Sequence, residues 1–184
     1  MSKKAVKIIG VLTGTILSLI MLSGCKGPTK KEPSDLAPDT VTYSVKTFMP
    51  GSYDVYVINS EEIIHYDFFA YWGHHDYEYF SYPLPAEDEY TVKVYSIEES
   101  EWEEIVNILN EKNFDTFPED FSTTYDVMDG GFTYIEVLSG ENRYFSGGYC
   151  VEEGKEPERE SYKEISIVLY NIVTNAKKHP KKTN

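Results

Sequence analysis

The sequence has few cysteines, little positive charge and none of the short motifs that mark the commonest enzyme sites. Its 184 residues include two Cys, and 17 Lys and Arg against 31 Asp and Glu. It has no Gly-x-Ser-x-Gly nucleophile elbow, no phosphate-cradling Gly-rich loop and no His-Glu-x-x-His metal motif. Paired carboxylates do occur, but 31 acidic residues produce such pairs by coincidence. No motif therefore argues for an enzyme.

Most of the negative charge lies in the middle of the chain. Between Thr40 and Ala176 there are 7 Lys and Arg against 28 Asp and Glu, a net charge of −21. Such a field repels phosphate polymers, so we expect no nucleic-acid partner. In the simplest interpretation the negative charge only keeps the protein soluble. The alternative, more specific interpretation is that it attracts a cationic peptide, a basic protein or metal ions.

The chain begins with a positive stretch that is followed by an apolar one. Lys3, Lys4 and Lys7 precede 15 residues without a charge, Ile8–Leu22. That run is shorter than the ~20 apolar residues of a membrane-spanning helix, and it ends at small residues, as a signal peptide does. The alternative is an uncleaved N-terminal helix in which Cys25 has no special role.

The uncharged run ends in Leu22, Ser23, Gly24 and Cys25, and these four residues resemble the lipobox of bacterial lipoprotein precursors. The resemblance implies that a signal peptidase recognises the first three and cuts before Cys25, whose sulfur carries diacylglycerol. No other cofactor is expected. Two acyl chains give stable attachment. We therefore expect a lipid-anchored protein on the extracytoplasmic face of the cell membrane.

The resemblance leaves Cys150 as the single free cysteine of an exported domain, so we expect no disulfide. Glu152 and Glu153 follow it, and their charge does not favour the thiolate that a nucleophile needs. We expect Cys150 to be buried as a small apolar residue.

Composition divides the chain into four parts. Residues 1–24 are the signal peptide, 25–39 the lipidated Cys and a flexible tether with three prolines, 40–178 a single domain, and 179–184 a basic tail. The 160 residues after the leader suffice for one domain with a core.

Hydrophobic periodicity predicts an α+β domain. We expect strands over 41–48, 53–58, 61–69, 90–97, 132–138 and 143–146, and helices over 97–113 and 157–178. Ser96 and Glu99 fit a capping box at the start of the first helix. The predicted apolar stripes are Trp102, Ile105, Val106, Leu109 and Phe114, and then Tyr162, Ile165, Ile167, Val168, Leu169, Ile172 and Val173. The order β-β-β-β-α-β-β-α predicts an antiparallel sheet of about six strands with two helices on one face.

The C-terminal half is similar to a family of small lipoproteins and secreted domains of Firmicutes. The shared features are the helix with Trp102, Ile105, Leu109 and Phe114, the Asp129-Gly130 turn, the strand Phe132–Leu138, the pair Gly147-Gly148, Pro157 and the closing helix. All of these features are structural. The resemblance covers residues 96–176 and implies no activity.

One segment, Tyr66–Pro85, is unusually aromatic, because nine of the 17 residues from Tyr66 to Tyr82 are aromatic. Aromatic residues on strands usually bury one face and pair across the sheet. If several are exposed instead, they form a surface for a peptide or a cell-surface glycan. The candidate ligand contacts are Tyr71, Trp72, Tyr77 and Tyr79.

The same segment contains His74, His75 and Asp76. Neighbouring residues on a strand point to opposite faces, so His74 and Asp76 are the pair that could share a metal ion, with His65 as a third ligand. The alternative is a solvated loop without a metal.

Three hypotheses follow. The first is a lipid-anchored extracellular protein with a non-catalytic acidic binding domain. The second is a small surface hydrolase or metal-dependent enzyme built around His74, His75 and Asp76. The third is an immunity or inhibitor-type lipoprotein that captures a cationic partner.

Overall fold

A computed structural model of the chain describes residues 32–47, 52–69, 90–121, 130–151 and 156–178. Within these ranges it contains six strands, two α-helices and a 3₁₀ turn. The strands are β1 (Thr40–Thr47), β2 (Ser52–Ile58), β3 (Glu62–Phe69), β4 (Tyr90–Ser96), β5 (Gly131–Ser139) and β6 (Asn142–Tyr149). The helices are α2 (Glu99–Glu111), the 3₁₀ turn η2 (Phe114–Thr116) and α3 (Pro157–Ala176). The predicted element order and fold class are confirmed.

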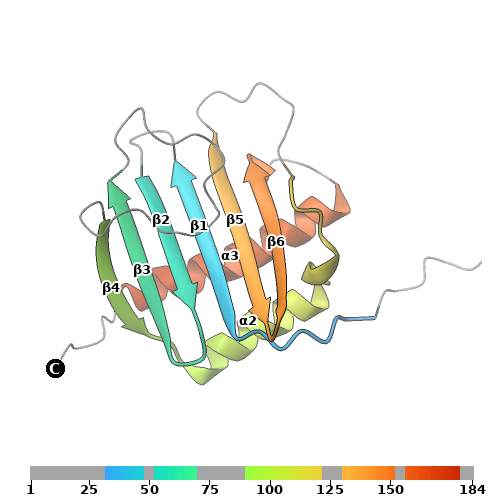
Figure 1. Cartoon of the computed structure of the whole chain (residues 1–184), viewed down its shortest axis with the longest axis horizontal. Helices are drawn as coiled ribbons and strands as arrows, with labels where there is room; N and C mark the ends of the chain where they lie inside the picture. Colours follow the sequence, from blue (N-terminus) through green and yellow to red (C-terminus); the bar gives the residue numbers. More distant parts are fainter. Residues whose placement is uncertain (1–31, 48–51, 70–89, 122–129, 152–155, 179–184) are drawn as a thin grey trace, which may run out of the picture. The chain divides into compact units, whose positions relative to one another are not determined.

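The six strands form one antiparallel sheet in the order β4-β3-β2-β1-β5-β6 (Figure 1). β1 lies between β2 and β5, so the first strand joins the N-terminal hairpins to the C-terminal one. Its pairing is in register on both sides, because Val41 faces Ile58 on one side and Val137 on the other. All three side chains are fully buried.

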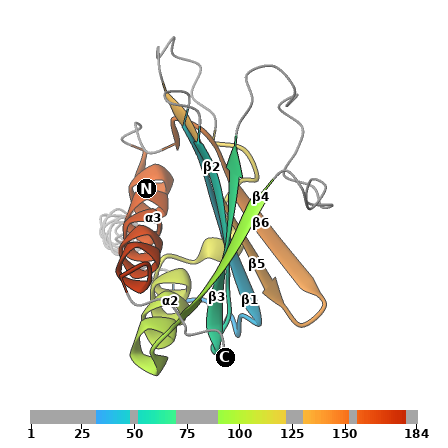
Figure 2. The same cartoon turned by 90° about the vertical axis from the view of Figure 1, so that its left-hand side faces the viewer.

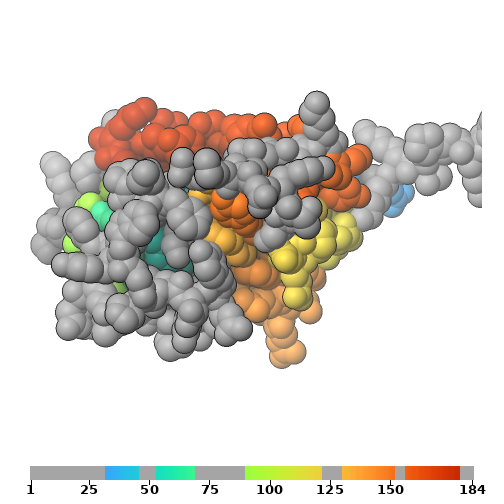
Figure 3. Space-filling view, turned by 90° about the horizontal axis from the view of Figure 1, so that it is seen from above, coloured from blue at the N-terminus to red at the C-terminus, as the bar shows by residue number. Residues whose placement is uncertain are grey.

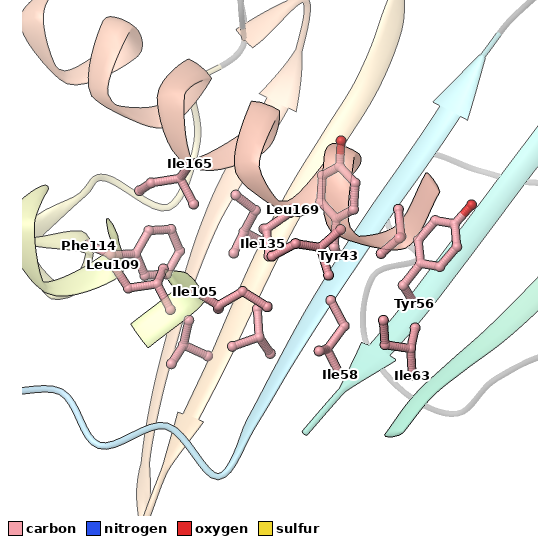
Figure 4. Close-up of a cluster of buried hydrophobic side chains, with 14 of the residues drawn as sticks. Tyr43, Tyr56, Ile58, Ile63, Ile105, Leu109, Phe114, Ile135, Ile165 and Leu169 are labelled. Carbon is pink, nitrogen blue, oxygen red and sulfur yellow. The ribbon is translucent and has the colours of Figure 1, made fainter. Parts of the chain in front are cut away.

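Both helices lie on the same side of the sheet (Figure 2). Alternation along the strands decides which side chains they cover. In β1, Val41 and Tyr43 point into the core, as do Ile135 and Val137 in β5. Figure 4 shows Tyr43 and Ile135 in one cluster with side chains from the helices and from η2, namely Ile105, Leu109, Phe114, Ile165 and Leu169.

The first helix begins two residues later than predicted. Ser96 still pairs with Glu62 across β3 and β4 and lies three residues before Glu99, the first residue of the helix, so it is not the capping residue. Glu98 is the capping residue instead, and its N–H donates to the carboxylate of Glu101 at 2.9 Å. The capping box exists, but its pair, Glu98 and Glu101, lies two residues further along the chain than the predicted pair of Ser96 and Glu99.

The predicted apolar stripes are largely correct. Ile105, Leu109 and Phe114 are buried, and Trp102 packs against them. In α3, Ile167 is an error, because it is 49% exposed while its neighbours Ser166 and Leu169 are buried. The side of α3 that is buried against the rest of the domain is too narrow to include position 167. Cys150 is free and buried, as predicted.

The folded part also begins earlier than predicted. Leu36, which we expected in the tether, belongs to the core and is 7% exposed. Its N–H donates to Asn110 Oδ1 at 2.5 Å, and Asn110 Nδ2 donates to its carbonyl at 2.9 Å. The side chain of Asn110 thus pairs with the backbone of Leu36 as a neighbouring strand would. The compact unit accordingly starts at Pro33.

Candidate binding surface and a buried histidine

Most of the predicted site residues lie outside the described ranges. This holds for Leu22, Ser23, Gly24 and Cys25 of the lipobox, for Tyr71, Trp72, Tyr77 and Tyr79, and for His74, His75 and Asp76. Those predictions remain predictions. The described part of the chain contains no cluster of three His, Cys, Asp or Glu residues suited to a metal ion. None of its helices is long and apolar enough to cross a membrane.

The side of the sheet away from the helices carries a row of aromatic residues that is interrupted at the central strand, β1. The register aligns Tyr149, Phe132, Lys46, Tyr53, Phe68 and Tyr90 across all six strands. The next row contains Tyr134 and Tyr66, with Ser44 and Val55 between them. Because alternate residues point to opposite faces, these side chains lie opposite the helix-covered core.

We call this surface the aromatic face and define it by Tyr53, Tyr66, Phe68, Tyr90, Phe132, Tyr134, Phe145 and Tyr149. Its rings form two groups. In the first, the ring centroids of Tyr53 and Phe68, and of Phe68 and Tyr90, are 5.1 Å apart. In the second, Phe132 contacts Tyr149 at 5.1 Å, and Tyr134 stacks on Phe145 at 5.5 Å. Between the two groups lies β1, whose positions on this side of the sheet are Thr42, Ser44 and Lys46.

The aromatic face carries one ion pair near its end. Arg143 Nε donates to Glu136 Oε2 at 2.6 Å, and the Arg143 guanidinium lies 5.4 Å from the centroid of the Phe145 ring. The pair cancels its own charge. Burial raises the pKa of Tyr134, and the nearby Asp120 carboxylate raises it further, so this tyrosine stays neutral.

The helix layer has the opposite character, because its solvent side is acidic. On α2, Glu99, Glu103, Glu104 and Glu111 are exposed. The nearest cation, Lys112, pairs with Glu164 and Glu111. Hydrogen bonding to Glu164 is the main reason that the pKa of Lys112 is raised. The domain therefore has an aromatic sheet face and an acidic helix face.

A buried histidine lies beneath the sheet, on the helix side. His65 is 2% exposed, and its Nε2 lies 2.5 Å from Asp54 Oδ1. The same carboxylate oxygen accepts from the Tyr56 hydroxyl at 3.3 Å and lies 3.9 Å from Lys177 Nζ, at the end of α3. Burial alone would raise the pKa of Asp54. The hydrogen bond from His65 and the charge of Lys177 more than offset burial and hold that pKa below its ordinary value.

Tyrosines enclose the imidazole. The Tyr56 ring stacks on His65 and on Tyr43, and Tyr95 lies on the other side of His65 at 6.3 Å between centroids. Burial, and then the Asp54 charge, raise the pKa of Tyr56 strongly. His65 Nδ1 is buried without a hydrogen-bond partner in the described structure. The stacked rings and the hydrogen bond to Asp54 pack β2 against β3.

His65 was predicted as a possible metal ligand, and the structure places it in the core with Nε2 committed to Asp54. Its predicted partners His74 and Asp76 lie outside the described residues. Sequence reasoning missed Asp54 and Lys177, because nothing in their spacing links them. It also missed the aromatic face on β5 and β6, although the alternation of Phe132 and Tyr134 with Ile135 is a readable signal that both faces of a strand are apolar.

Comparison with models of known protein families finds no match for this chain. Comparison with curated proteins finds no match either. The function is therefore argued from the geometry described above.

Proposed function

We propose that the protein is a lipoprotein anchored on the extracytoplasmic face of the membrane, with a non-catalytic acidic domain that binds a cationic polypeptide. The observation that carries the binding proposal is the aromatic face. Among the described elements no helix covers it, while both helices cover the opposite face. Seven of its eight rings are partly exposed, whereas Phe68 is buried. The anchor rests on the Leu22–Cys25 sequence and on the signal-peptide character of the residues before it.

Charge supports a cationic ligand. After residue 24 the chain has 14 Lys and Arg against 31 Asp and Glu, a net charge of −17. A field of this sign speeds the encounter with a basic partner and opposes an anionic one.

Aromatic rings add short-range attraction to that field. A cation over an aromatic ring is stabilised by about 0.5–1 kcal/mol when exposed, and by about 2 kcal/mol when desolvated. Rings of this protein already accept cations, since Lys177 Nζ lies 5.1 Å from the Tyr56 centroid and Arg143 lies over Phe145. An extended chain with Lys or Arg side chains is therefore attracted to the aromatic face both by the net negative charge of the protein and by cation–π contacts with the rings.

The anchor is tested with Cys25→Ser, because a hydroxyl cannot form the thioether. We expect the wild-type protein to partition into the membrane or detergent phase and Cys25→Ser to leave it. Cys150→Ser is the matched control and keeps the wild-type distribution. A Cys25→Ser protein that stays with the membrane would contradict the anchor.

Binding is tested with the full chain in detergent, titrated with a lysine-rich synthetic decapeptide. We expect an affinity that falls as salt rises and that drops about 5-fold or more in Tyr134→Ser, since 1 kcal/mol is about a factor of five. Tyr170→Ser is the control, because Tyr170 is 58% exposed on α3, on the far side of the sheet. Binding of a neutral cell-surface glycan in place of the peptide would replace the proposed ligand. Unchanged affinity in Tyr134→Ser would contradict the proposal that the aromatic face is the binding surface.

A further inference from the structure

We propose that β4 is the docking edge of the domain, at which an extended polypeptide segment adds to the sheet as a further strand. This inference rests on the proposed function, since it concerns the same cationic polypeptide and places one extended segment of it at the β4 edge of the sheet. It commits to a ligand in extended conformation whose alternate residues are apolar.

The two edges of the sheet differ. At the β6 edge a segment of the chain itself pairs with the strand, because Phe121 N–H donates to the Gly147 carbonyl at 2.6 Å and Gly147 N–H donates to the Glu119 carbonyl at 3.2 Å. Figure 3 shows this segment, in yellow, against the orange strands. That edge is therefore covered at Gly147.

The β4 edge has no such cover among the described residues. On its inner side β4 pairs with β3 from Tyr90 to Ser96, and the sheet ends there. An edge strand presents a row of backbone N–H and C=O groups that can template another chain. Natural sheets usually guard such an edge with charge, and Lys93 is the one charged residue of β4. It pairs with Asp67 at 3.8 Å.

The side chains of β4 define what kind of strand fits beside it. Tyr90, Val92 and Val94 belong to the aromatic side of the sheet, and Val92 is 51% exposed. On the helix side, β4 presents Thr91, Lys93 and Tyr95. An added strand therefore buries apolar residues against Val92 at every second position and keeps polar residues on the other side, while its backbone supplies the affinity.

Charge selects the partner. Glu98 and Glu99 are exposed where β4 passes into α2, so a basic residue at that end of the added strand meets opposite charge. A second copy of this chain is a poor occupant, because two chains that each carry a net charge of −17 after residue 24 repel one another. The fitting partner is a basic polypeptide with alternating apolar residues.

Amide hydrogen exchange on the full-length protein tests whether the edge is open. We expect two classes of amide in β4, with residues whose N–H points toward β3 protected and the alternate ones exchanging fast. If every amide of β4 is protected in the free protein, the edge is already paired, by the chain's own segment 70–89 or by a second copy, and the proposal is overturned.

Peptide binding tests the docking mode. The probe is a ten-residue synthetic peptide in which Val and Thr alternate between terminal lysines, with two variants N-methylated on alternate sets of residues. Only one set can donate to β4, so we expect one variant to lose at least 10-fold in affinity and the other to keep it. Val92→Lys should lose at least 10-fold, whereas Ile167→Lys, at an equally exposed apolar position on α3, should not.

The outcomes separate the two proposals. Binding that survives Val92→Lys and both methylations but falls in Tyr134→Ser overturns the docking edge and leaves the aromatic face as the binding surface. Absence of binding by this peptide and by the lysine-rich decapeptide overturns both.

Discussion

The imidazole of His65 lies parallel to the ring of Tyr56, with centroids 4.5 Å apart and an angle of 10° between the planes. The two residues are direct cross-strand partners on β3 and β2. Such pairs are the unit of sheet stabilisation. Here the stack also holds Nε2 of His65 against Asp54, so packing and hydrogen bonding fix the same ring.

The His65–Asp54 pair should contribute measurably to stability. A hydrogen bond to a charged group is worth about 1.5–3 kcal/mol, and residues in contact show coupling of about 0.5–3 kcal/mol. We expect a double-mutant cycle of His65→Phe and Asp54→Asn, read from urea unfolding, to give a coupling of about 1–2 kcal/mol. Asp67→Asn, which breaks the exposed pair with Lys93, should cost about 0.5 kcal/mol or less. If the effects of the two single substitutions on the unfolding free energy add up to that of the double variant, the pair has no coupling energy and the prediction is wrong.

Asp54 should also make stability depend on pH in the acid range. Its folded-state pKa lies below the ordinary 3.8, so the unfolded chain takes up the proton first. The contribution is therefore present above about pH 4 and is lost as the pH falls through the folded-state value. We expect the difference in unfolding free energy between wild type and Asp54→Asn to be constant from pH 5 to 7 and to shrink below pH 4. A difference that grows on acidification would have the wrong sign.

Asn110 should hold the segment before β1 in place. Replacing it with Ala leaves the N–H and C=O of Leu36 without their partners, at about 1–3 kcal/mol for a buried group. We expect Asn110→Ala to lower the unfolding free energy by about that amount and to make the chain near Leu36 sensitive to protease. Asn107→Ala, an exposed position of the same helix, is the control and should change neither.

Gly147 should not tolerate a side chain. A Cβ there would lie 2.3 Å from the Thr133 carbonyl oxygen and 2.7 Å from Tyr134 Cα, both backbone atoms. We expect Gly147→Ala to destabilise by about 3 kcal/mol or more and to disturb the pairing of β6 with Glu119–Phe121. Gly140, in the hairpin turn at φ +57°, has nothing within 4 Å, so Gly140→Ala should cost only the backbone strain of about 1–2 kcal/mol. Equal costs would mean that crowding at Gly147 is relieved.

The fold could be predicted because its local patterns are strong. Alternation placed β1 and β2 within one residue of their ends, and the 3.6-residue period identified both helices. Boundaries were less accurate where tertiary pairing extends an element. Pairing with β5 carries β6 on to Tyr149, past the predicted end at Ser146, although Gly147 and Gly148 are poor strand formers.

The site was harder to predict because it is assembled across the sheet. Asp54 and Lys177 are 123 positions apart and meet only because α3 ends over β2. The aromatic face combines Tyr53 with Phe132 only through the central position of β1. Sequence spacing within one segment, such as Tyr66–Pro85, contains no information about these partners.

The attachment of Leu36 to Asn110 sets a limit on where a lipidated protein can act. With the domain starting at Pro33, seven residues lie between it and Cys25, and the chain from Cys25 to Pro33 spans at most about 25–30 Å when fully stretched. A domain held by acyl chains at Cys25 would stay within about that distance of the lipid headgroups. It would therefore bind molecules that reach the bilayer surface and not molecules farther from the cell.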